Sequence, residues 1–223
     1  MSDEIVVLVH GLWMNGMDMS LLRHRLEKAG YETRRFTYRS VRSRPLENAM
    51  DLNAFILTLE APVIHFLCHS LGGLVVRHLF HEFPDQRPGR VVTLGTPHQP
   101  SSAAQSLIHV PPFRVLFGKS IVNGLLGKVP VWNSDHELGS IAGNLRLGLG
   151  MIAPGVVRPN DGTVAVTETM LNEMKDHVVV HASHFGLLLS GSAARQGIHF
   201  LRTGCFIQES TGSVLNSTLI NFD

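Results

Sequence analysis

The sequence has no strong excess of charge of either sign and no long apolar run. It contains 19 Lys and Arg residues against 18 Asp and Glu residues, which gives a formal charge of +1. This balance offers no bulk electrostatic reason to expect a nucleic acid or an anionic membrane as a partner. No segment of about twenty uninterrupted apolar residues occurs, so we expect no transmembrane segment.

Cysteine is also scarce, with only Cys68 and Cys205 present. Two cysteines cannot build a disulfide framework, and Cys68 lies in an apolar run, where a thiol behaves as a small apolar side chain. Residues 1–4 are acidic where a signal peptide would be basic, and the apolar run 5–9 is too short for an export segment. We therefore expect a cytoplasmic protein.

Composition and length indicate one folded domain. Hydrophobic residues make up 44% of the 223 residues and charged residues 17%, which is typical of a globular enzyme-like protein and not of a disordered chain. We expect a single domain over residues 1–208. The Ser-, Thr- and Asn-rich end, 209–223, is expected to form a tail or a short edge strand.

Strand and helix patterns alternate along the chain. Short β-rich apolar runs predict strands, and apolar residues at helical spacing predict the helices between them. The predicted strands are 5–9, 31–38 (at a sheet edge), 63–67, 90–94, 137–143 and 177–181, and the predicted helices are 15–30, 45–59, 74–83 and 195–208. This alternation predicts a compact α/β fold, with a mostly parallel sheet of about six strands and helices on both faces.

The alternation fails between residues 97 and 138. This segment contains Pro111-Pro112, several glycines and scattered apolar residues. A long connection without a clear pattern is either a helical cap or lid over a pocket or an ordinary crossover between strands. The sequence leaves both alternatives open.

A serine follows the apolar run 63–67 at a tight turn. Gly72 and Gly73 come directly after Ser70 and Leu71, and helical spacing resumes at Leu74. On a strand-turn-helix of this kind, a serine hydroxyl is held out from the sheet edge. The alternative is a plain turn, because short strings of Ser and Gly also arise by chance.

Further residues with catalytic chemistry follow the other predicted strands. In a parallel α/β sheet the carboxyl ends of the strands lie at one edge, where ligands bind. The residues just past the strand ends are His10-Gly11-Leu12, Ser70, Gly95-Thr96-Pro97, Asp161 and His184. We therefore expect a nucleophile, an acid and a base at this edge, in the chain order Ser, Asp, His.

This arrangement resembles a compact α/β-hydrolase of the lipase and esterase type. The strings that carry the resemblance are His-Gly-Leu-Trp at 10–13, Cys-His-Ser-Leu-Gly-Gly at 68–73, and Asn-Asp-Gly-Thr-Val at 160–164 followed by His-Phe-Gly-Leu-Leu at 184–188. Together they span most of the chain. One departure is Cys68, which stands where the family string G-x-S-x-G begins with glycine and puts a side chain where strand and helix approach closely. Cys68 itself is a poor nucleophile, since it should be buried in the strand.

The resemblance implies a Ser-His-Asp triad that cleaves carboxylic esters. A serine hydroxyl is a weak nucleophile until an imidazole accepts its proton, and a carboxylate orients that imidazole and stabilises its charge. The resemblance assigns these roles to Ser70, His184 and Asp161. It requires no cofactor and no metal ion.

The resemblance also implies where the oxyanion and the substrate would lie. It places the oxyanion-hole donors at the backbone amides of Leu12 and Leu71. We expect Trp13, Met14 and Thr96 to belong to the substrate pocket, and the apolar segment 107–132 to line or cover it.

Each acid and base assignment has a rival. Asp161 and the glycine that follows it could form a plain turn. Asp135 falls in the irregular segment, and Asp176 precedes a strand instead of following one, so both fit the acid less well. His181 lies three residues before His184, and it fits better as a packing or hydrogen-bonding residue at the strand end.

The remaining histidines are expected to be structural. His69 adjoins the serine, but neighbours on a tight turn diverge, and His10 belongs to the turn that shapes the oxyanion site. The 13 histidines invite a metal hypothesis. However, His177, His181 and His184 do not converge on one face of a strand, and no carboxylate or cysteine set completes a site.

Five arginines fall within residues 34–44. The simple interpretation is a solvated edge strand and loop. The functional interpretation is contact with an acidic substrate headgroup or partner beside the site.

Two classes of function follow. The first is hydrolysis of a small-molecule or lipid ester through an acyl-enzyme, and the same machinery serves thioesterases and acyltransferases. The second is a non-catalytic hydrolase-fold protein that binds a ligand. No nucleic-acid partner is expected, and the oligomeric state does not follow from the sequence.

Overall fold

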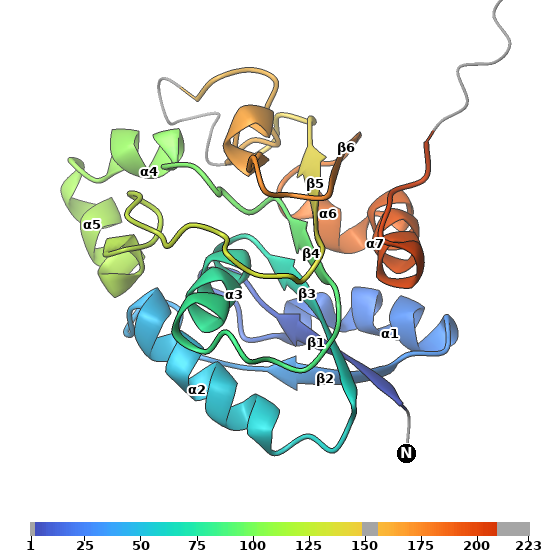
Figure 1. The fold of residues 1–223 in the computed structure, drawn as a ribbon. Helices are drawn as coiled ribbons and strands as arrows, with labels where there is room; N and C mark the ends of the chain where they lie inside the picture. The colour runs from blue at the N-terminus through green and yellow to red at the C-terminus, as the bar shows by residue number, and fades with distance from the viewer. Residues whose placement is uncertain (1–2, 149–155, 209–223) are drawn as a thin grey trace, which may run out of the picture.

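The computed structural model describes residues 3–148 and 156–208, whose six strands form one sheet (Figure 1). The strands are β1 (Glu4–Val9), β2 (Glu32–Phe36), β3 (Val63–His69), β4 (Val91–Leu94), β5 (Leu138–Gly143) and β6 (Asp176–Val180). Their order across the sheet is β2-β1-β3-β4-β5-β6, and every neighbouring pair is parallel. The predicted parallel α/β sheet is confirmed.

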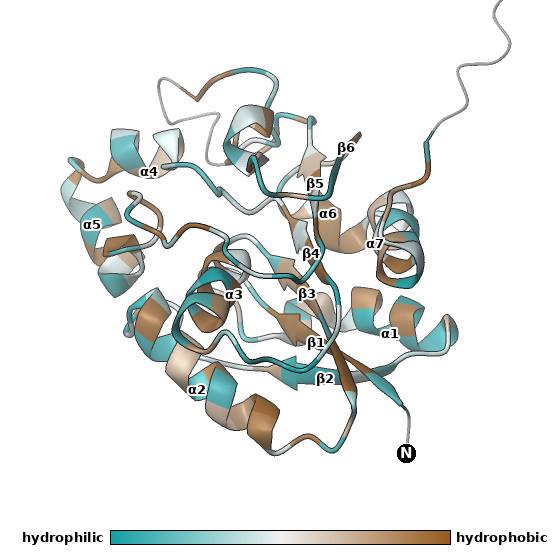
Figure 2. Ribbon diagram, in the orientation of Figure 1, coloured by the Kyte–Doolittle hydropathy of each residue, from teal (hydrophilic) through white to brown (hydrophobic). Residues whose placement is uncertain are grey.

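The burial of each strand matches its place in the sheet. In β1 only Glu4 is exposed, and β4 and β5 are buried throughout, because helices cover both of their faces. The edge strand β2 instead exposes Arg34 while it buries Thr33 and Phe36. Figure 2 shows hydrophobic colour along the central strands β1 and β3, whereas the edge strand β2 is largely hydrophilic.

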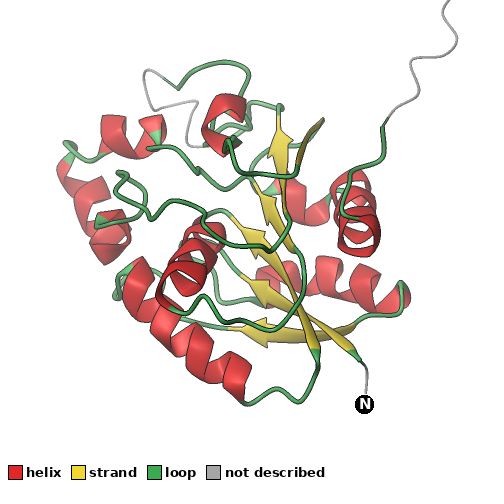
Figure 3. Cartoon of the chain, viewed as in Figure 1, coloured by secondary structure: helices red, strands yellow, loops and turns green. Residues whose placement is uncertain are grey.

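Helices lie against both faces of the sheet (Figure 3). One face carries α1 (Ser20–Lys28), α6 (Gly186–Leu189) and α7 (Gly191–Thr203), and the other carries α2 (Pro45–Leu57) and α3 (Leu71–Glu82). Each face has its own apolar core: Leu22, Leu26 and Phe200 belong to the first, and Leu52 and Leu74 to the second. The predicted placement of helices on both faces is confirmed.

All four predicted helices have different bounds in the structure, and the first and the last differ most. The last helix was expected at 195–208, but α7 begins at Gly191, because the Ser190 hydroxyl oxygen accepts a hydrogen bond of 3.1 Å from the Ala193 amide and caps its first turn. It ends before Gly204, whose φ of 79° suits a glycine C-cap. The helix expected at 15–30 divides into a 3-10 turn η1 (Met17–Met19) and α1.

The irregular segment between β4 and β5 contains α4 (Ser102–Leu107), α5 (Pro111–Phe117) and the 3-10 turn η2 (Gly118–Ile121). Figure 1 shows these helices beyond the end of the sheet to which the arrowheads point. The Ser101 side chain caps α4 by accepting from the Ala104 amide at 3.2 Å, and Leu107 and Phe117 are buried. Segment 209–223, expected as a tail or edge strand, lies outside the described residues.

A short 3-10 turn η4 (Val166–Thr169) precedes β6.

Over residues 3–148 and 156–208, no helix combines the length and the apolar character that crossing a membrane requires.

Candidate active site

Ser70 lies on a strained turn between β3 and α3. Its φ of 52° and ψ of −121° are unusual for a residue with a side chain, and they turn the hydroxyl away from the strand. The turn brings α3 close to β1. A Cβ on Gly72 would clash with the carbonyl oxygen of Val9, at the end of β1, and would lie 2.7 Å from that of His10. Only a glycine allows this approach at position 72.

Cys68 is accommodated inside the strand. The side chain is completely buried and belongs to the apolar core on the α2 and α3 face of the sheet. Burial raises the pKa of the Cys68 thiol, since the thiolate would lose its hydration. The thiol in place of the family glycine is thus a packed, protonated group, as expected for an inert cysteine.

Three side chains from distant segments form one hydrogen-bonded line. The His184 Nε2 atom lies 3.0 Å from the Ser70 hydroxyl oxygen, and its Nδ1 atom lies 2.7 Å from Asp161 Oδ2. Ser70 and His184 are 114 residues apart in the chain, yet both reach the carboxyl end of the sheet. This geometry suits a serine whose proton is accepted by an imidazole that a carboxylate orients.

The loop around Asp161 holds the carboxylate in place. Asp161 Oδ1 accepts hydrogen bonds of 2.9 and 2.7 Å from the amides of Thr163 and Val164, and the His184 amide donates to the Asp161 carbonyl at 2.8 Å. Asp161 is 1% exposed. Gly162, at φ 91°, provides the turn. One carboxylate oxygen is therefore fixed by the backbone while the other meets the imidazole.

The rival acids and base lie elsewhere. Asp135 is exposed and lines a cavity at the other end of the sheet. The Asp176 carboxylate accepts from the Phe206 and His177 amides. The His181 ring lies 3.1 Å from Asn144 Oδ1. Neither Asp135 nor Asp176 hydrogen-bonds to His184, and His181 does not hydrogen-bond to Ser70.

The loop that carries Leu12 is held by His10 and Tyr38. The two rings stack at 4.3 Å, and the Tyr38 hydroxyl donates to the His10 carbonyl oxygen at 2.7 Å. His10 Nδ1 donates to the Gly11 carbonyl at 2.8 Å, and its Nε2 accepts from the Tyr38 amide at 3.3 Å, so the ring is neutral. Burial lowers its pKa in agreement with this. Tyr38 carries no catalytic signal in the sequence, because it stands at the end of a predicted edge strand.

Leu12 and Leu71 carry the two amides that are expected to bind the oxyanion. Leu71 is the first residue of α3, and the first amides of a helix have no acceptor within it. Leu12 lines the cavity beside the Ser70 hydroxyl. Donation from these two amides to an oxyanion stays a prediction.

A cavity of about 190 Å³ opens at Ser70 and His184. Most of its wall is apolar, and it includes the expected residues Trp13 and Met14. The other apolar wall residues are Leu12, Pro97, Ala103, Ala104, Leu107, Phe117, Leu125, Val164 and Phe185. Helices α4 and α5 thus contribute directly to this wall.

Thr96 lies behind the turn that carries Ser70 and does not belong to the cavity wall. It is completely buried, and its hydroxyl donates to the Ser70 carbonyl oxygen at 2.8 Å. The neighbouring Pro97 lines the cavity instead. Gly95, at φ 58°, leaves room for the hydrogen bond between Asp161 and His184. A Cβ at this position would lie 3.0 Å from both Asp161 Oδ2 and His184 Nδ1.

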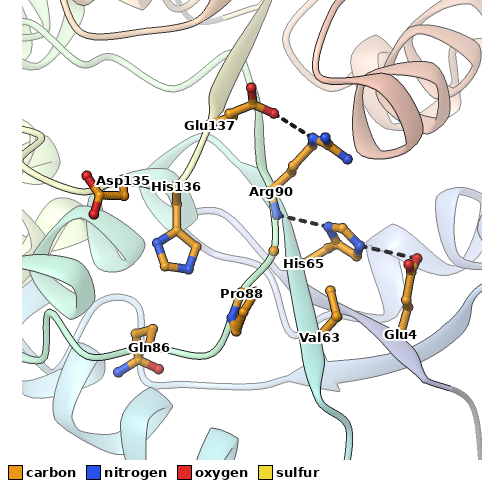
Figure 4. Close-up of a pocket in the computed structure, with 10 residues that line it drawn as sticks. Glu4, Val63, His65, Gln86, Pro88, Arg90, Asp135, His136 and Glu137 are labelled. Atoms are coloured by element: carbon orange, nitrogen blue, oxygen red, sulfur yellow. Dashed lines mark hydrogen bonds and ion pairs between the residues drawn. The ribbon is translucent and has the colours of Figure 1, made fainter.

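A larger cavity, of about 500 Å³, lies at the amino ends of the strands (Figure 4). Arg90 donates to Glu137 at 2.7 Å across it, and the Arg90 amide donates to His65 Nδ1 at 2.9 Å. Glu4 lies 3.4 Å from the other ring nitrogen of His65. Neither Ser70 nor His184 lines this cavity. Although it is the larger of the two, it is separate from the hydrogen-bonded Ser70, His184 and Asp161 side chains.

No cluster of three or more His, Cys, Asp or Glu side chains within residues 3–148 and 156–208 has a geometry suited to a metal ion. His177 lies 2.9 Å from the Thr169 hydroxyl, away from His184.

Sequence comparison places the chain in a known family. A profile of the alpha/beta hydrolase family matches residues 6–195. The chain belongs to this family. No curated protein matches the sequence.

Solved structures share the hydrolase fold at low sequence identity. A lipase of Bacillus licheniformis in its propeptide form is 16% identical with a TM-score of 0.66, covering 82% of this chain and 46% of its own. The metagenomic carboxyl esterase MGS0156 is 18% identical with a TM-score of 0.64, covering 82% of this chain and 64% of its own. A lipase-esterase related protein of Clostridium acetobutylicum is 14% identical with a TM-score of 0.61, covering 92% and 95%.

This hydrolase-family chain therefore spans about half the length of the first of these proteins and under two thirds of the second. The likeness establishes the fold.

Proposed function

We propose that this chain is a serine hydrolase that cleaves carboxylic esters through an acyl-enzyme. The observation that carries the proposal is the line from Ser70 through His184 to Asp161, with separations of 3.0 and 2.7 Å. An imidazole that lies between a hydroxyl and a buried carboxylate is placed to accept the hydroxyl proton. Membership of the hydrolase family supports the same reaction class.

The reaction would proceed in two halves. Ser70 Oγ attacks the ester carbonyl carbon while its proton passes to His184 Nε2, and Asp161 stabilises the imidazolium. The amides of Leu12 and Leu71 donate to the oxyanion. The alcohol leaves with the proton from His184, and a water molecule then releases the acid by the same steps.

The cavity favours a short, apolar acyl group. Its volume of about 190 Å³ is smaller than the roughly 300–1,000 Å³ of pockets for drug-sized ligands. Its walls offer apolar side chains and no buried cation beside Ser70. A charged acyl group would lose its hydration there without compensation.

The test is labelling with a fluorophosphonate probe, comparing the native protein with Ser70→Ala. A suitable control is Ser140→Ala, since Ser140 is also buried but donates to the Thr169 carbonyl in another part of the fold. We expect labelling of the native and control proteins and none of Ser70→Ala. Labelling that survives Ser70→Ala would overturn the assignment of the nucleophile.

Turnover of p-nitrophenyl esters of increasing acyl length tests the substrate class. We expect the highest kcat/KM for short acyl groups. A protein that is labelled but cleaves no ester would instead point to thioester cleavage, acyl transfer or ligand binding.

A further inference from the structure

The arginine-rich loop lies against the helices that cover the cavity. The Lys119 amide donates to the Val41 carbonyl oxygen at 2.8 Å, and Gly118 passes so close to Val41 that a Cβ would clash with it. Figure 1 shows α5 next to the N-terminal end of α2, which this loop precedes. Two segments that the sequence separates by about seventy residues therefore form one surface.

Trp13 joins this surface to the mouth of the cavity. Its indole Nε1 donates to the Leu116 carbonyl oxygen at 2.8 Å, and its amide donates to the Ser40 hydroxyl oxygen at 3.2 Å. Its ring stacks on Phe117 at 5.7 Å between centroids. Trp13 and Phe117 both line the cavity above Ser70. The surface is thus the rim of the candidate active site.

Four cations on this rim have no acidic partner. Arg39, Arg42, Arg114 and Lys119 are exposed, and within the described part of the chain their side chains form no hydrogen bond or ion pair. Segments 33–46 and 97–134 contain no Asp or Glu. The overall charge of +1 therefore coexists with a strongly basic rim, because salt screens acidic groups that lie more than about 10 Å away and they do not cancel the charge at the rim.

Apolar side chains project from the same rim. Val115 is 77% exposed, Leu116 49% and Val110 41%, and all three lie on α5 or at its N-cap. Pro111 at the first turn of α5 is exposed as well. Contiguous exposed apolar side chains on a folded domain mark a surface that contacts another apolar phase or partner.

We propose that this basic and apolar rim (Arg39, Arg42, Arg114, Lys119, Val115 and Leu116) docks on an anionic phospholipid surface. The cations match anionic headgroups, and Val115 and Leu116 enter the region between headgroups and acyl chains. Exposed valine and leucine side chains favour a lipid over a nucleic acid, which would leave them without an apolar contact. Docked in this way, the cavity mouth beside Trp13 faces the lipid.

This inference goes beyond the proposed hydrolysis and can be tested without turnover. Ser70→Ala protein is sedimented with vesicles of phosphatidylcholine alone or with added phosphatidylglycerol, at low and high salt. We expect binding to the anionic vesicles at low salt, at least ten-fold weaker binding to the neutral ones, and loss of binding at high salt. Failure to bind anionic vesicles overturns the docking proposal and leaves the ester hydrolase proposal untouched.

Matched pairs of variants locate the docking surface. Arg39→Gln with Arg42→Gln should weaken binding roughly 10- to 30-fold. The control Lys28→Gln with Arg195→Gln removes the same charge from exposed positions on α1 and α7 and should change it less than about three-fold. Equal weakening by the two pairs would contradict a rim-specific contact.

A second pair of variants tests the contribution of exposed apolar side chains to vesicle binding. Val115→Ser should weaken vesicle binding about 3- to 10-fold, while Leu57→Ser, at a residue 74% exposed at the far end of α2, should not. No effect of Val115→Ser would indicate a surface for a polyanion and overturn the lipid assignment. A dimer in solution that Val115→Ser converts to a monomer would also overturn it, since a second copy would then cover the rim. Circular dichroism of each variant verifies folding.

Discussion

The Nε2 atom of His69 lies 3.0 Å from the carbonyl oxygen of His184, so the residue before Ser70 binds the backbone of the proposed base. A carbonyl only accepts, so Nε2 carries the proton. The two rings are 4.8 Å apart. Burial, with a smaller contribution from His184, lowers the pKa of His69 to about 3. His69 is therefore a neutral donor that positions His184, and Gly11 leaves it space, because a Cβ there would lie 2.8 Å from His69 Nδ1.

His69 predicts a specific pH dependence of stability. In the unfolded chain a histidine takes up a proton near pH 6.5, whereas folded His69 does so only near pH 3. Between these values unfolding takes up a proton, so the free energy of unfolding falls as the pH is lowered, by up to about 1.4 kcal/mol per pH unit for this group. Other buried histidines, such as His98, add to the same trend.

Urea unfolding at pH 7, 6, 5 and 4 measures this dependence. His69→Gln should flatten it by about 1 kcal/mol per pH unit. The control is His24→Gln, at an exposed position on α1, which should leave the slope unchanged. Identical slopes for the native protein and His69→Gln would show that His69 is protonated in the fold as readily as in the unfolded chain.

Asp161→Asn should abolish most catalysis while the fold survives. The asparagine Oδ1 can still accept from the Thr163 and Val164 amides, but its amide nitrogen cannot accept the proton on His184 Nδ1, so the imidazole is held in the wrong tautomer. We expect kcat for an ester to fall on the order of 10⁴-fold. Steady-state kinetics with a p-nitrophenyl ester gives the value.

Asp135→Asn is the matched control for this change. Asp135 is exposed at the other end of the sheet, so its removal should leave kcat within about two-fold. If Asp135→Asn were the inactive variant, the acid would have been misassigned.

Gly72→Ala should destabilise the turn between β3 and α3 that carries Ser70. The added methyl group would lie 2.7 Å from the His10 carbonyl oxygen, which forces α3 away from β1 and shifts Ser70. We expect a loss of about 1–3 kcal/mol in the free energy of unfolding together with most of the esterase activity.

Gly191→Ala provides the comparison in the same chain. No atom lies within 4 Å of a Cβ at Gly191, in the first turn of α7, so alanine should be neutral or stabilise the protein by up to about 1 kcal/mol. Thermal unfolding separates the two variants. Equal Tm values would show that the close approach at Gly72 is not required.

Leu107→Ala should enlarge the acyl cavity. Leu107 is 4% exposed and lines the cavity from the end of α4. The substitution removes three carbon atoms, so the preferred acyl chain should lengthen by roughly two carbons at a cost of about 2–5 kcal/mol in stability. The kcat/KM values across an acyl-length series provide the measurement.

Leu171→Ala controls for the loss of stability. Leu171 is 8% exposed and lies outside the cavity at Ser70. It should lower stability without changing the preferred acyl length. A shift in both variants would mean that loosening of the fold, and not cavity volume, sets the preference.

The sequence by itself determined the parallel α/β sheet and the order Ser70, Asp161, His184 at its strand ends. It could do so because strand and helix periodicity are local patterns, and because the carboxyl ends of parallel strands must meet at one edge. Local patterns did not fix the ends of the last helix, which depend on the caps at Ser190 and Gly204.

Only the tertiary structure decided which side chains meet. The sequence favoured Asp161 over Asp135 and Asp176 but could not show a contact. The tertiary structure brings Asp161 Oδ2 to 2.7 Å from His184 Nδ1, and periodicity does not encode the path of the loop that does so. It also brought the loop at 39–44 against α5. Arg39 and Arg42, which the sequence places in a solvated loop, thereby join the rim of the cavity, because surface charge acts through neighbours in space and not in sequence.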